Sequence, residues 1–358
     1  MSDLHGGNIY KIRRELKISK VNDFSVNLNP LGIPKKLIKC LKNNIKIISQ
    51  YPDPDYTEIK EELSKYLGID ENFIISGNGA TELISLYAGS VPNKKVLIVA
   101  PTFSEYENAF KRNNAKIDYF YLKEENDFNL DIDDLIKKVK NYDVLVICNP
   151  NNPTGNFISL ERMAKIAHEC LKSNTNLFID EAFIEFIENY KNHSAINIFK
   201  EYKNIFILRA LTKFFAVPGL RIGYGITGDE KLLETMGQLQ DIWNINILAS
   251  FAAKVVLNDK KYIESSFEII KAERDFLYQK LGKIENLKVY KPESNFILVK
   301  ILNGMSSVEL KKLLLEKYHT LIRDCSNFRY LDDRFFRIAV KKRKANLHIY
   351  LVLKNIFS

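Results

Sequence analysis

Lys213 is the residue whose setting in the sequence most clearly indicates covalent chemistry. It follows a short apolar segment, and Arg221 stands eight positions further on. A lysine amine can form an imine with an aldehyde when neighbouring cations and burial lower its pKa, and an arginine can bind a phosphate. In a chain with 53 lysines and arginines, a solvated surface charge is the alternative interpretation of Lys213 taken alone.

Two further polar clusters each follow a predicted strand. Residues 149–155 come after the apolar segment 142–148, and Asp180 begins a cluster after residues 176–179. Open α/β sheets bind ligands at the carboxyl ends of their strands. We therefore expect these clusters to share one site with Lys213, although Asp180 alone could also be a helix N-cap.

The elements that must position these residues alternate between short strands and helices. Strands are predicted at residues 73–75, 96–100, 142–148, 176–179, 205–208 and 222–226. A helix is predicted at residues 160–171, with Ser159 as N-cap and with Met163, Ala164, Ala167 and Leu171 packing at helical spacing. This alternation predicts an α/β fold with a mostly parallel sheet and helices on both faces.

The pattern changes after about residue 246. Long helical stretches come first, followed by strand material at residues 287–300, a capping box from Ser306 to Glu309 and a strand at residues 336–340. We expect a second, smaller α+β domain.

The order of the motifs resembles that of the fold-type I pyridoxal-phosphate enzymes of the class I/II aminotransferase superfamily, over nearly the whole chain. The motifs lie at residues 77–82, 100–106, 149–155, 180–183 and 209–224. The resemblance implies pyridoxal 5′-phosphate as the cofactor and a homodimer with shared active sites. It also implies a large cofactor-binding domain at residues 36–246 and a small domain built from residues 1–35 and 247–358.

The resemblance assigns roles to individual residues. Lys213 would anchor the cofactor and Asp180 would face its ring nitrogen, both as catalytic residues. Phe103 would stack on the ring, and Asn152 would hydrogen-bond the 3′-oxygen. The residues expected at the cofactor phosphate are Gly79, Ala80, Thr81, Thr212 and Arg221, with Tyr51 reaching the phosphate in the neighbouring subunit.

Some segments resemble the L-threonine O-3-phosphate decarboxylases, which make aminopropan-2-ol phosphate for cobalamin assembly. They are residues 5–8 and 322–329. Phe183 stands where related aminotransferases have tyrosine, so a hydroxyl that would assist Asn152 is missing, a loss of about 1 kcal/mol. Tyr330 stands where glycine is expected. The candidates for the substrate phosphate are His5, Asn29, Arg323 and Arg329, and Arg337 is expected to bind the substrate carboxylate.

The expected function is therefore pyridoxal-phosphate-dependent decarboxylation of L-threonine O-3-phosphate, a small phosphorylated amino acid. One alternative is amino transfer from histidinol phosphate to 2-oxoglutarate, which would use the same Lys213, Asp180 and arginines. A more distant alternative is a non-catalytic regulatory relative that keeps the fold for its surface.

Composition and charge argue against several other classes of protein. The net charge of +9 and the basic run at residues 341–344 permit a nucleic-acid partner, but lysine and glutamate are spread throughout and no recognised binding motif is present. We expect neither a nucleic-acid nor a membrane partner, because no apolar stretch reaches the roughly 20 residues that span a bilayer. The polar start predicts a cytoplasmic protein. The cysteines and histidines lack metal-ligand spacing, so no metal is predicted.

Overall fold

The computed structural model describes residues 6–18 and 20–357. Its largest element is a seven-stranded sheet with the order β2-β8-β7-β6-β5-β3-β4. The strands are β2 (Ile74–Gly77), β3 (Lys95–Ala100), β4 (Lys116–Tyr121), β5 (Val144–Cys148), β6 (Asn176–Asp180), β7 (Ile205–Ala210) and β8 (Gly223–Thr227). Neighbouring strands run parallel except where β8 pairs with β2 and β7. The predicted mostly parallel sheet is confirmed.

The six strands predicted for this sheet are present, with ends that differ by at most two residues. The prediction missed β4, which lies at one edge of the sheet. Its residues are mostly exposed or half-buried, whereas β5 and β7 are buried along their whole length. An edge strand lacks the continuous apolar run that marks a central parallel strand, so its sequence signal is weaker.

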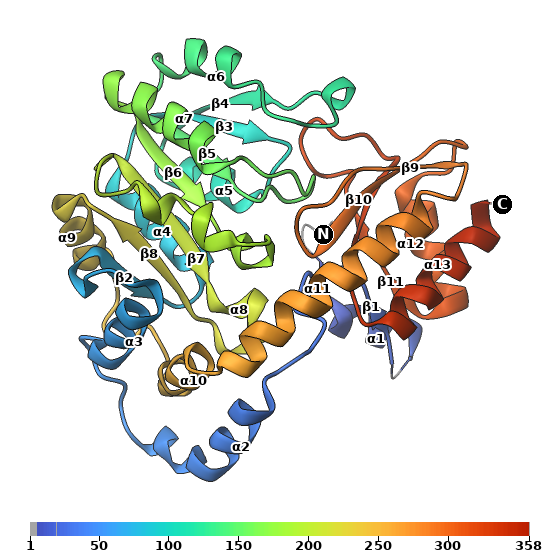
Figure 1. Cartoon of the computed structure of the whole chain (residues 1–358), viewed down its shortest axis with the longest axis horizontal. Coiled ribbons are helices and arrows are strands. Elements are labelled where there is room, and N and C mark those ends of the chain that lie inside the picture. Colours follow the sequence, from blue (N-terminus) through green and yellow to red (C-terminus); the bar gives the residue numbers. More distant parts are fainter. Residues whose placement is uncertain (1–5, 19, 358) are drawn as a thin grey trace.

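Helices cover both faces of the sheet (Figure 1). One face carries α4 (Ala80–Ser90), α5 (Glu105–Arg112) and α9 (Glu230–Leu239), which share one apolar core. The other face carries α2 (Lys35–Asn44), α3 (Thr57–Leu67), α6 (Ile132–Val139), α7 (Leu160–Lys172), α8 (Leu211–Phe214) and α10 (Ile247–Leu257), which share the largest core. Short 3-10 helices lie at Ile45–Ser49, Glu71–Phe73, Glu124–Asn126, Ile184–Phe186, Tyr190–Asn192, Ala195–Asn197 and Pro218–Leu220.

The helix α7 confirms most of what its sequence pattern predicted. Ser159 is its N-cap, and the hydroxyl accepts a hydrogen bond from the backbone N–H of Arg162, as predicted. Its buried residues are Met163, Ile166, Ala167 and Cys170, which are spaced three or four apart. The expected packing role of Leu171 is wrong, because this position lies on the adjacent face and is 46% exposed.

A smaller sheet lies beside the large one. It has the order β12-β13-β10-β9, formed by β9 (Leu287–Val289), β10 (Phe296–Ile301), β12 (Arg323–Asp324) and β13 (Phe335–Ala339), all antiparallel. The predicted strand material at 287–300 is thus two strands. The helices α12 (Ser307–Tyr318) and α13 (Arg343–Phe357) pack on this sheet, and α12 begins with the predicted capping box.

The start of the chain folds with its C-terminal part. The helix α1 (Ile9–Leu16) packs near the end of α12, and β1 (Asn22–Asp23) pairs in parallel with β11 (Thr320–Leu321). The long helix α11 (Lys260–Leu281) contributes to both the main core and the core of the small sheet, and it runs between the two bodies in Figure 1. The exact domain boundary at residue 246 stays a prediction, since α10 shares the main core.

None of the helices in the described parts of the chain is long and apolar enough to cross a membrane.

Candidate active site

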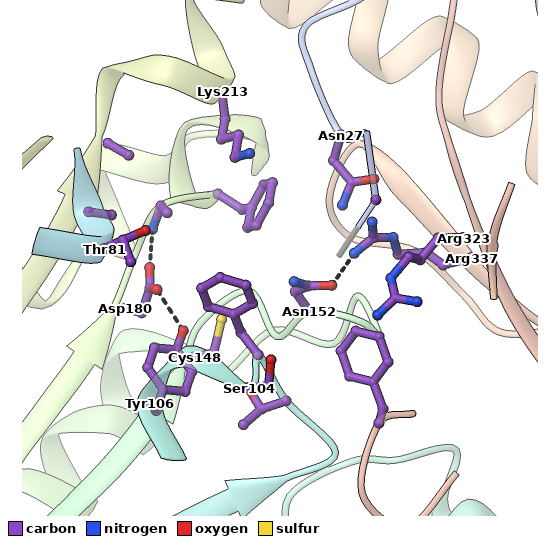
Figure 2. A pocket seen from close by; sticks show the side chains of 18 of the residues that line it. Asn27, Thr81, Ser104, Tyr106, Cys148, Asn152, Asp180, Lys213, Arg323 and Arg337 are labelled. Atoms are coloured by element: carbon purple, nitrogen blue, oxygen red, sulfur yellow. Dashed lines mark hydrogen bonds between the residues drawn. The ribbon is translucent and has the colours of Figure 1, made fainter. Parts of the chain in front are cut away.

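A cavity of about 270 Å³ lies where the large sheet meets the small one. Cys148, Asp180 and Ala210 line it from the carboxyl ends of β5, β6 and β7, and Arg323 and Arg337 line it from β12 and β13. Figure 2 shows Cys148 and Asp180 on one side of the cavity and Arg323 and Arg337 on the other. The predicted clusters therefore meet at the carboxyl ends of the parallel strands, where such sheets bind ligands.

Lys213 reaches into the cavity from α8, the short helix directly after the buried strand β7 (Figure 2). Burial, together with the charges of Arg337 and Arg221, lowers the pKa of its amine to about 8. Near neutral pH both the neutral and the protonated amine are then populated. Such an amine can act as a nucleophile and can carry a proton.

Asp180 is the last residue of β6 and is buried. Its carboxylate accepts hydrogen bonds from the hydroxyl of Tyr106 at 2.6 Å and from the backbone N–H of Ala182 at 2.8 Å. Burial nevertheless raises the pKa of Asp180 to about 6. A cation placed against it would stabilise the carboxylate form, so the site suits a protonated ring nitrogen. Tyr106 was not predicted as a site residue, although it is the last residue of the motif at residues 100–106.

The first turn of α4 forms a phosphate-sized cradle with Arg221. Gly79 precedes this helix with a φ of +82°, and a Cβ built there would lie 2.5 Å from Nη2 of Arg221. Ala80, Thr81, Thr212 and Arg221 all line the cavity. A helix N-terminus beside a guanidinium attracts anions. The residues present therefore fit the phosphate of pyridoxal phosphate, and only glycine leaves room for this arginine.

Asn152 and Phe103 line the cavity, and Asn152 lies between Asp180 and the two arginines (Figure 2). The amide oxygen of Asn152 accepts a hydrogen bond from Arg337, which leaves its amide nitrogen directed toward the rest of the cavity (Figure 2). Phe183 also lines the cavity, and its ring packs edge-on against Phe296 at 5.1 Å. The position that a tyrosine hydroxyl would occupy in related aminotransferases is thus apolar here.

Arg323 and Arg337 are buried guanidiniums that lie close together (Figure 2). Arg323 donates to the side chain of Asn327 at 2.7 Å, and Arg337 donates to the carbonyl of Ser25 at 2.8 Å. Burial lowers the pKa of Arg337 to about 10, and the charge of Arg323 adds to this. Within the described residues, Nε of Arg337 has no hydrogen-bond partner. Two buried cations side by side, one of them with this unpaired donor, favour an anionic ligand.

Asn29 lies elsewhere than expected. Its amide nitrogen donates to the carbonyl of Phe214 at 2.8 Å and to the hydroxyl of Ser266 at 2.7 Å, so it holds the Lys213 segment rather than lining the cavity. Asn27 lines the cavity instead, and its buried amide oxygen has no partner among the described residues (Figure 2). Only Asn29 was predicted, and Asn27 was missed. The side chain that faces the cavity depends on the backbone path of an irregular segment, because the alternation of faces holds only in a regular strand.

Of the three remaining predicted site residues, Arg329, Tyr51 and His5, only Arg329 is placed at the cavity. Arg329 lines the cavity, but its Nε donates to Glu107 at 2.7 Å in an ion pair. Tyr51 is 78% exposed and packs against Trp243 with ring centroids 4.7 Å apart, away from the cavity of its own chain. His5 lies outside the described residues, and Gly6, which follows it, lines the cavity.

The fold and this site define a class of protein. The model of the family "Aminotransferase class I and II" matches residues 19–351, so the chain belongs to this family, and pyridoxal phosphate is its cofactor. Among the relatives, a threonine-phosphate decarboxylase of Salmonella typhimurium is 34% identical over 99% of this chain and 96% of its own.

Two other relatives extend the comparison. A provisionally named threonine-phosphate decarboxylase of Caldanaerobacter subterraneus is 40% identical over 99% of this chain and 94% of its own. The crystal structure of the histidinol-phosphate aminotransferase from Clostridium acetobutylicum has a TM-score of 0.88 at 38% identity, and the match covers 94% of this chain and 99% of that one. Both kinds of enzyme that the sequence motifs resembled are therefore close relatives.

Proposed function

We propose that this protein decarboxylates L-threonine O-3-phosphate to aminopropan-2-ol phosphate, a step of cobalamin biosynthesis, with pyridoxal phosphate as cofactor. The observation that carries the proposal is the pair of buried guanidiniums, Arg323 and Arg337, facing Lys213 across a small cavity. The substrate has two anionic groups, a phosphate and a carboxylate. Two buried cations match its charge, and the relatives named threonine-phosphate decarboxylase support the same reaction.

When bound, pyridoxal phosphate supplies the sink for the electron pair of the bond that breaks at Cα. Asp180 stabilises positive charge at the ring nitrogen, and Tyr106 holds this carboxylate in place. Loss of CO2 leaves the electron pair of the broken bond near Cα, where a proton must be added. Lys213, with a pKa of about 8, can donate that proton near neutral pH.

The orientation of the substrate decides which bond breaks, because only the Cα bond perpendicular to the ring overlaps with its π system. Decarboxylation requires the carboxylate in this position, whereas amino transfer requires the hydrogen. Arg323 and Arg337 both lie on the side of the small sheet and can hold the two anions together. We keep Arg337 as the carboxylate ligand and place Arg323 at the phosphate, where Asn27, which lines the same cavity, can donate from its amide nitrogen.

Amino transfer from histidinol phosphate is the second candidate, which the Clostridium acetobutylicum structure favours. The test is a mixed assay of purified holoenzyme. O-Phosphothreonine should release CO2 without any keto acid, and Lys213→Ala should abolish this release. Formation of glutamate from histidinol phosphate and 2-oxoglutarate, without CO2 release from O-phosphothreonine, would overturn the proposal. If Lys213→Ala changed neither activity nor the absorbance of the protein, the non-catalytic alternative would replace both.

We also infer a homodimer. Apolar side chains near Tyr51 are strongly exposed, namely Ile48 at 61%, Ile242 at 63% and Trp243 at 44%. Exposed apolar groups gathered in one region favour a protein interface, and Tyr51 would then reach the cofactor phosphate in the neighbouring subunit. Light scattering should give twice the mass of the chain. A cytoplasmic location and the lack of a nucleic-acid partner stay predictions.

A further inference from the structure

The outer end of the cavity carries an ion pair that joins the two bodies of the protein. Arg329 follows β12 of the small sheet, and Glu107 lies on α5 beside the large sheet. Both Nε and Nη2 of the guanidinium donate to the carboxylate, the first at 2.7 Å. The side chain of Glu107 is 15% exposed and that of Arg329 is 47% exposed. Lys213 and Asp180, by contrast, lie at the buried end of the same cavity.

Aromatic rings extend this contact. The guanidinium of Arg329 lies 4.5 Å from the ring centre of Tyr119, and Tyr119 stacks on Tyr121 at 5.9 Å. Tyr121 stacks in turn on Tyr330 at 4.8 Å, with 25° between the ring planes. Tyr119 and Tyr121 belong to β4 of the large sheet, so this stack also joins the two bodies.

The backbone of Tyr330 indicates that its ring has a specific role. Its φ is +70°, in the left-handed region where glycine is favoured, and glycine was expected at this position. A tyrosine there costs about 1–2 kcal/mol in backbone energy. The ring is 53% exposed, so burial in a core does not offset that cost. Its stack with Tyr121 is the contact that the side chain provides.

Glu107 also changes what Arg329 can do. The hydrogen bonds from Arg329 lower the pKa of Glu107 to about 2, so the carboxylate is ionised at any working pH and balances the charge of the arginine. Lys111 and Tyr119 hydrogen-bond the same carboxylate. A substrate anion would have to displace this carboxylate to reach Arg329, which is half exposed, whereas Arg323 and Arg337 also line the cavity and are buried.

We propose that Glu107, Tyr119 and Arg329, which line the cavity, form a clasp with Tyr121 and Tyr330 stacked beside them. The clasp closes the outer end of the cavity and selects short phosphorylated amino acids over longer phosphorylated amines. The proposal rests on the proposed function, since it names the feature that limits substrate length at the same site. Arg329 is then a positioning residue rather than a phosphate ligand. Closing the outer end keeps the two anions of a short substrate at Arg323 and Arg337.

The variant Glu107→Ala tests whether Arg329 belongs to the clasp or binds the substrate phosphate, because the two roles predict opposite changes in KM for O-phosphothreonine. If Arg329 belongs to the clasp, Glu107→Ala raises KM for O-phosphothreonine about three- to fivefold, the effect of a partly exposed ion pair. Arg329→Ala has the same effect, and the double variant is no worse than either single one. If Arg329 binds the phosphate, Glu107→Ala frees it and lowers KM, while Arg329→Ala raises it.

The ratio of the affinities for a short and a long substrate distinguishes a role in selectivity from a purely structural role, because a loss of stability alone would not change this ratio. Each substitution is placed in the Lys213→Ala background, which cannot turn over the substrate, and binding of O-phosphothreonine and of histidinol phosphate is measured by calorimetry with pyridoxal phosphate present. Glu107→Ala, Arg329→Ala and Tyr330→Gly should each shift the ratio of the two affinities toward histidinol phosphate by about three- to fivefold. Tyr330→Gly should do so without loss of stability, because it relieves the backbone. Glu188→Ala removes an exposed ion pair with Lys271 elsewhere and should leave the ratio unchanged.

A lower KM in Glu107→Ala, additive effects in the double variant, or an unchanged affinity ratio would each overturn the clasp. The proposed decarboxylation and the proposed clasp can be refuted independently of each other. If the wild-type enzyme releases no CO2 from O-phosphothreonine, the proposed function is wrong, and the affinity ratios still decide whether the clasp selects by length.

Discussion

Replacing Gly79 by alanine tests whether Arg221 binds the cofactor phosphate. The new Cβ would lie 2.5 Å from Nη2 and 2.9 Å from Cζ of Arg221, which is closer than any real contact. The atoms that must move belong to the end of a flexible side chain, so the fold can survive the substitution. The guanidinium, however, cannot stay where it is. We therefore expect the variant to fold and to bind the cofactor weakly.

The magnitude follows from two separate effects. A φ of +82° is unfavourable for alanine, which lowers the free energy of unfolding by about 1–2 kcal/mol. Displacing Arg221 removes a charge-assisted contact worth about 1.5–3 kcal/mol, or about 10- to 150-fold in the dissociation constant of pyridoxal phosphate. The assay is titration of the cofactor-free protein with pyridoxal phosphate, followed by absorbance, together with thermal unfolding.

Gly68→Ala is the matched control. Gly68 has a φ of +71°, and a Cβ built there meets no atom within 4 Å. Both variants should lose similar stability, but only Gly79→Ala should lose cofactor affinity. If the dissociation constant in Gly79→Ala stayed within twofold of the wild-type value, or if Gly68→Ala weakened cofactor binding equally, the assignment of the cradle to the phosphate would be refuted.

Four further variants test the electrostatics and the corrected site. Burial holds the pKa of Lys213 at about 8 in the folded protein, below its usual 10.5, so the unfolded chain binds more protons between these pH values. Lys213→Met should therefore stabilise the cofactor-free protein at pH 7 by up to about 3 kcal/mol, measured by thermal unfolding. This gain should disappear as the pH rises from 8 to 10.5. Tyr106→Phe removes a hydrogen bond to the ionised form of Asp180 and so raises the pKa of this carboxyl group. The acid limb of the profile of activity against pH should therefore move to higher pH by about 1–2 units. An unmoved acid limb would refute the role of Tyr106 in holding Asp180 ionised. Asn29→Ala should lower the free energy of unfolding by about 1–3 kcal/mol and leave KM for O-phosphothreonine unchanged. Asn27→Ala should raise this KM about five- to tenfold at nearly unchanged stability. The reverse pattern would show that Asn29, and not Asn27, belongs to the site.

The fold could be predicted well because its signals are local. Continuous apolar runs marked the central strands, and Ser159 and the Ser306–Glu309 pair marked two helix starts. Edge strand β4 was missed, and Leu171 was placed on the wrong side of its helix. These failures share a cause, since a partly exposed position is defined by what packs against it and not by its own residue type.

The sequence by itself determined the chemistry at Lys213. Asp180, Asn152 and the lysine lie at or after the carboxyl ends of parallel strands, which the topology of such a sheet brings to one edge. Arg221 lies just before β8, which runs antiparallel and therefore starts at the same edge. Residue types and their order were therefore enough to identify the family and its cofactor.

Only the tertiary structure decided how the far side of the cavity is used. It placed Asn27 rather than Asn29 at the cavity, engaged Arg329 with Glu107 and stacked Tyr330 on Tyr121. These contacts join residues that are more than 180 positions apart in the chain, across two bodies with separate cores. No local pattern encodes such a pairing, because a side chain's partner depends on how the two bodies pack against each other.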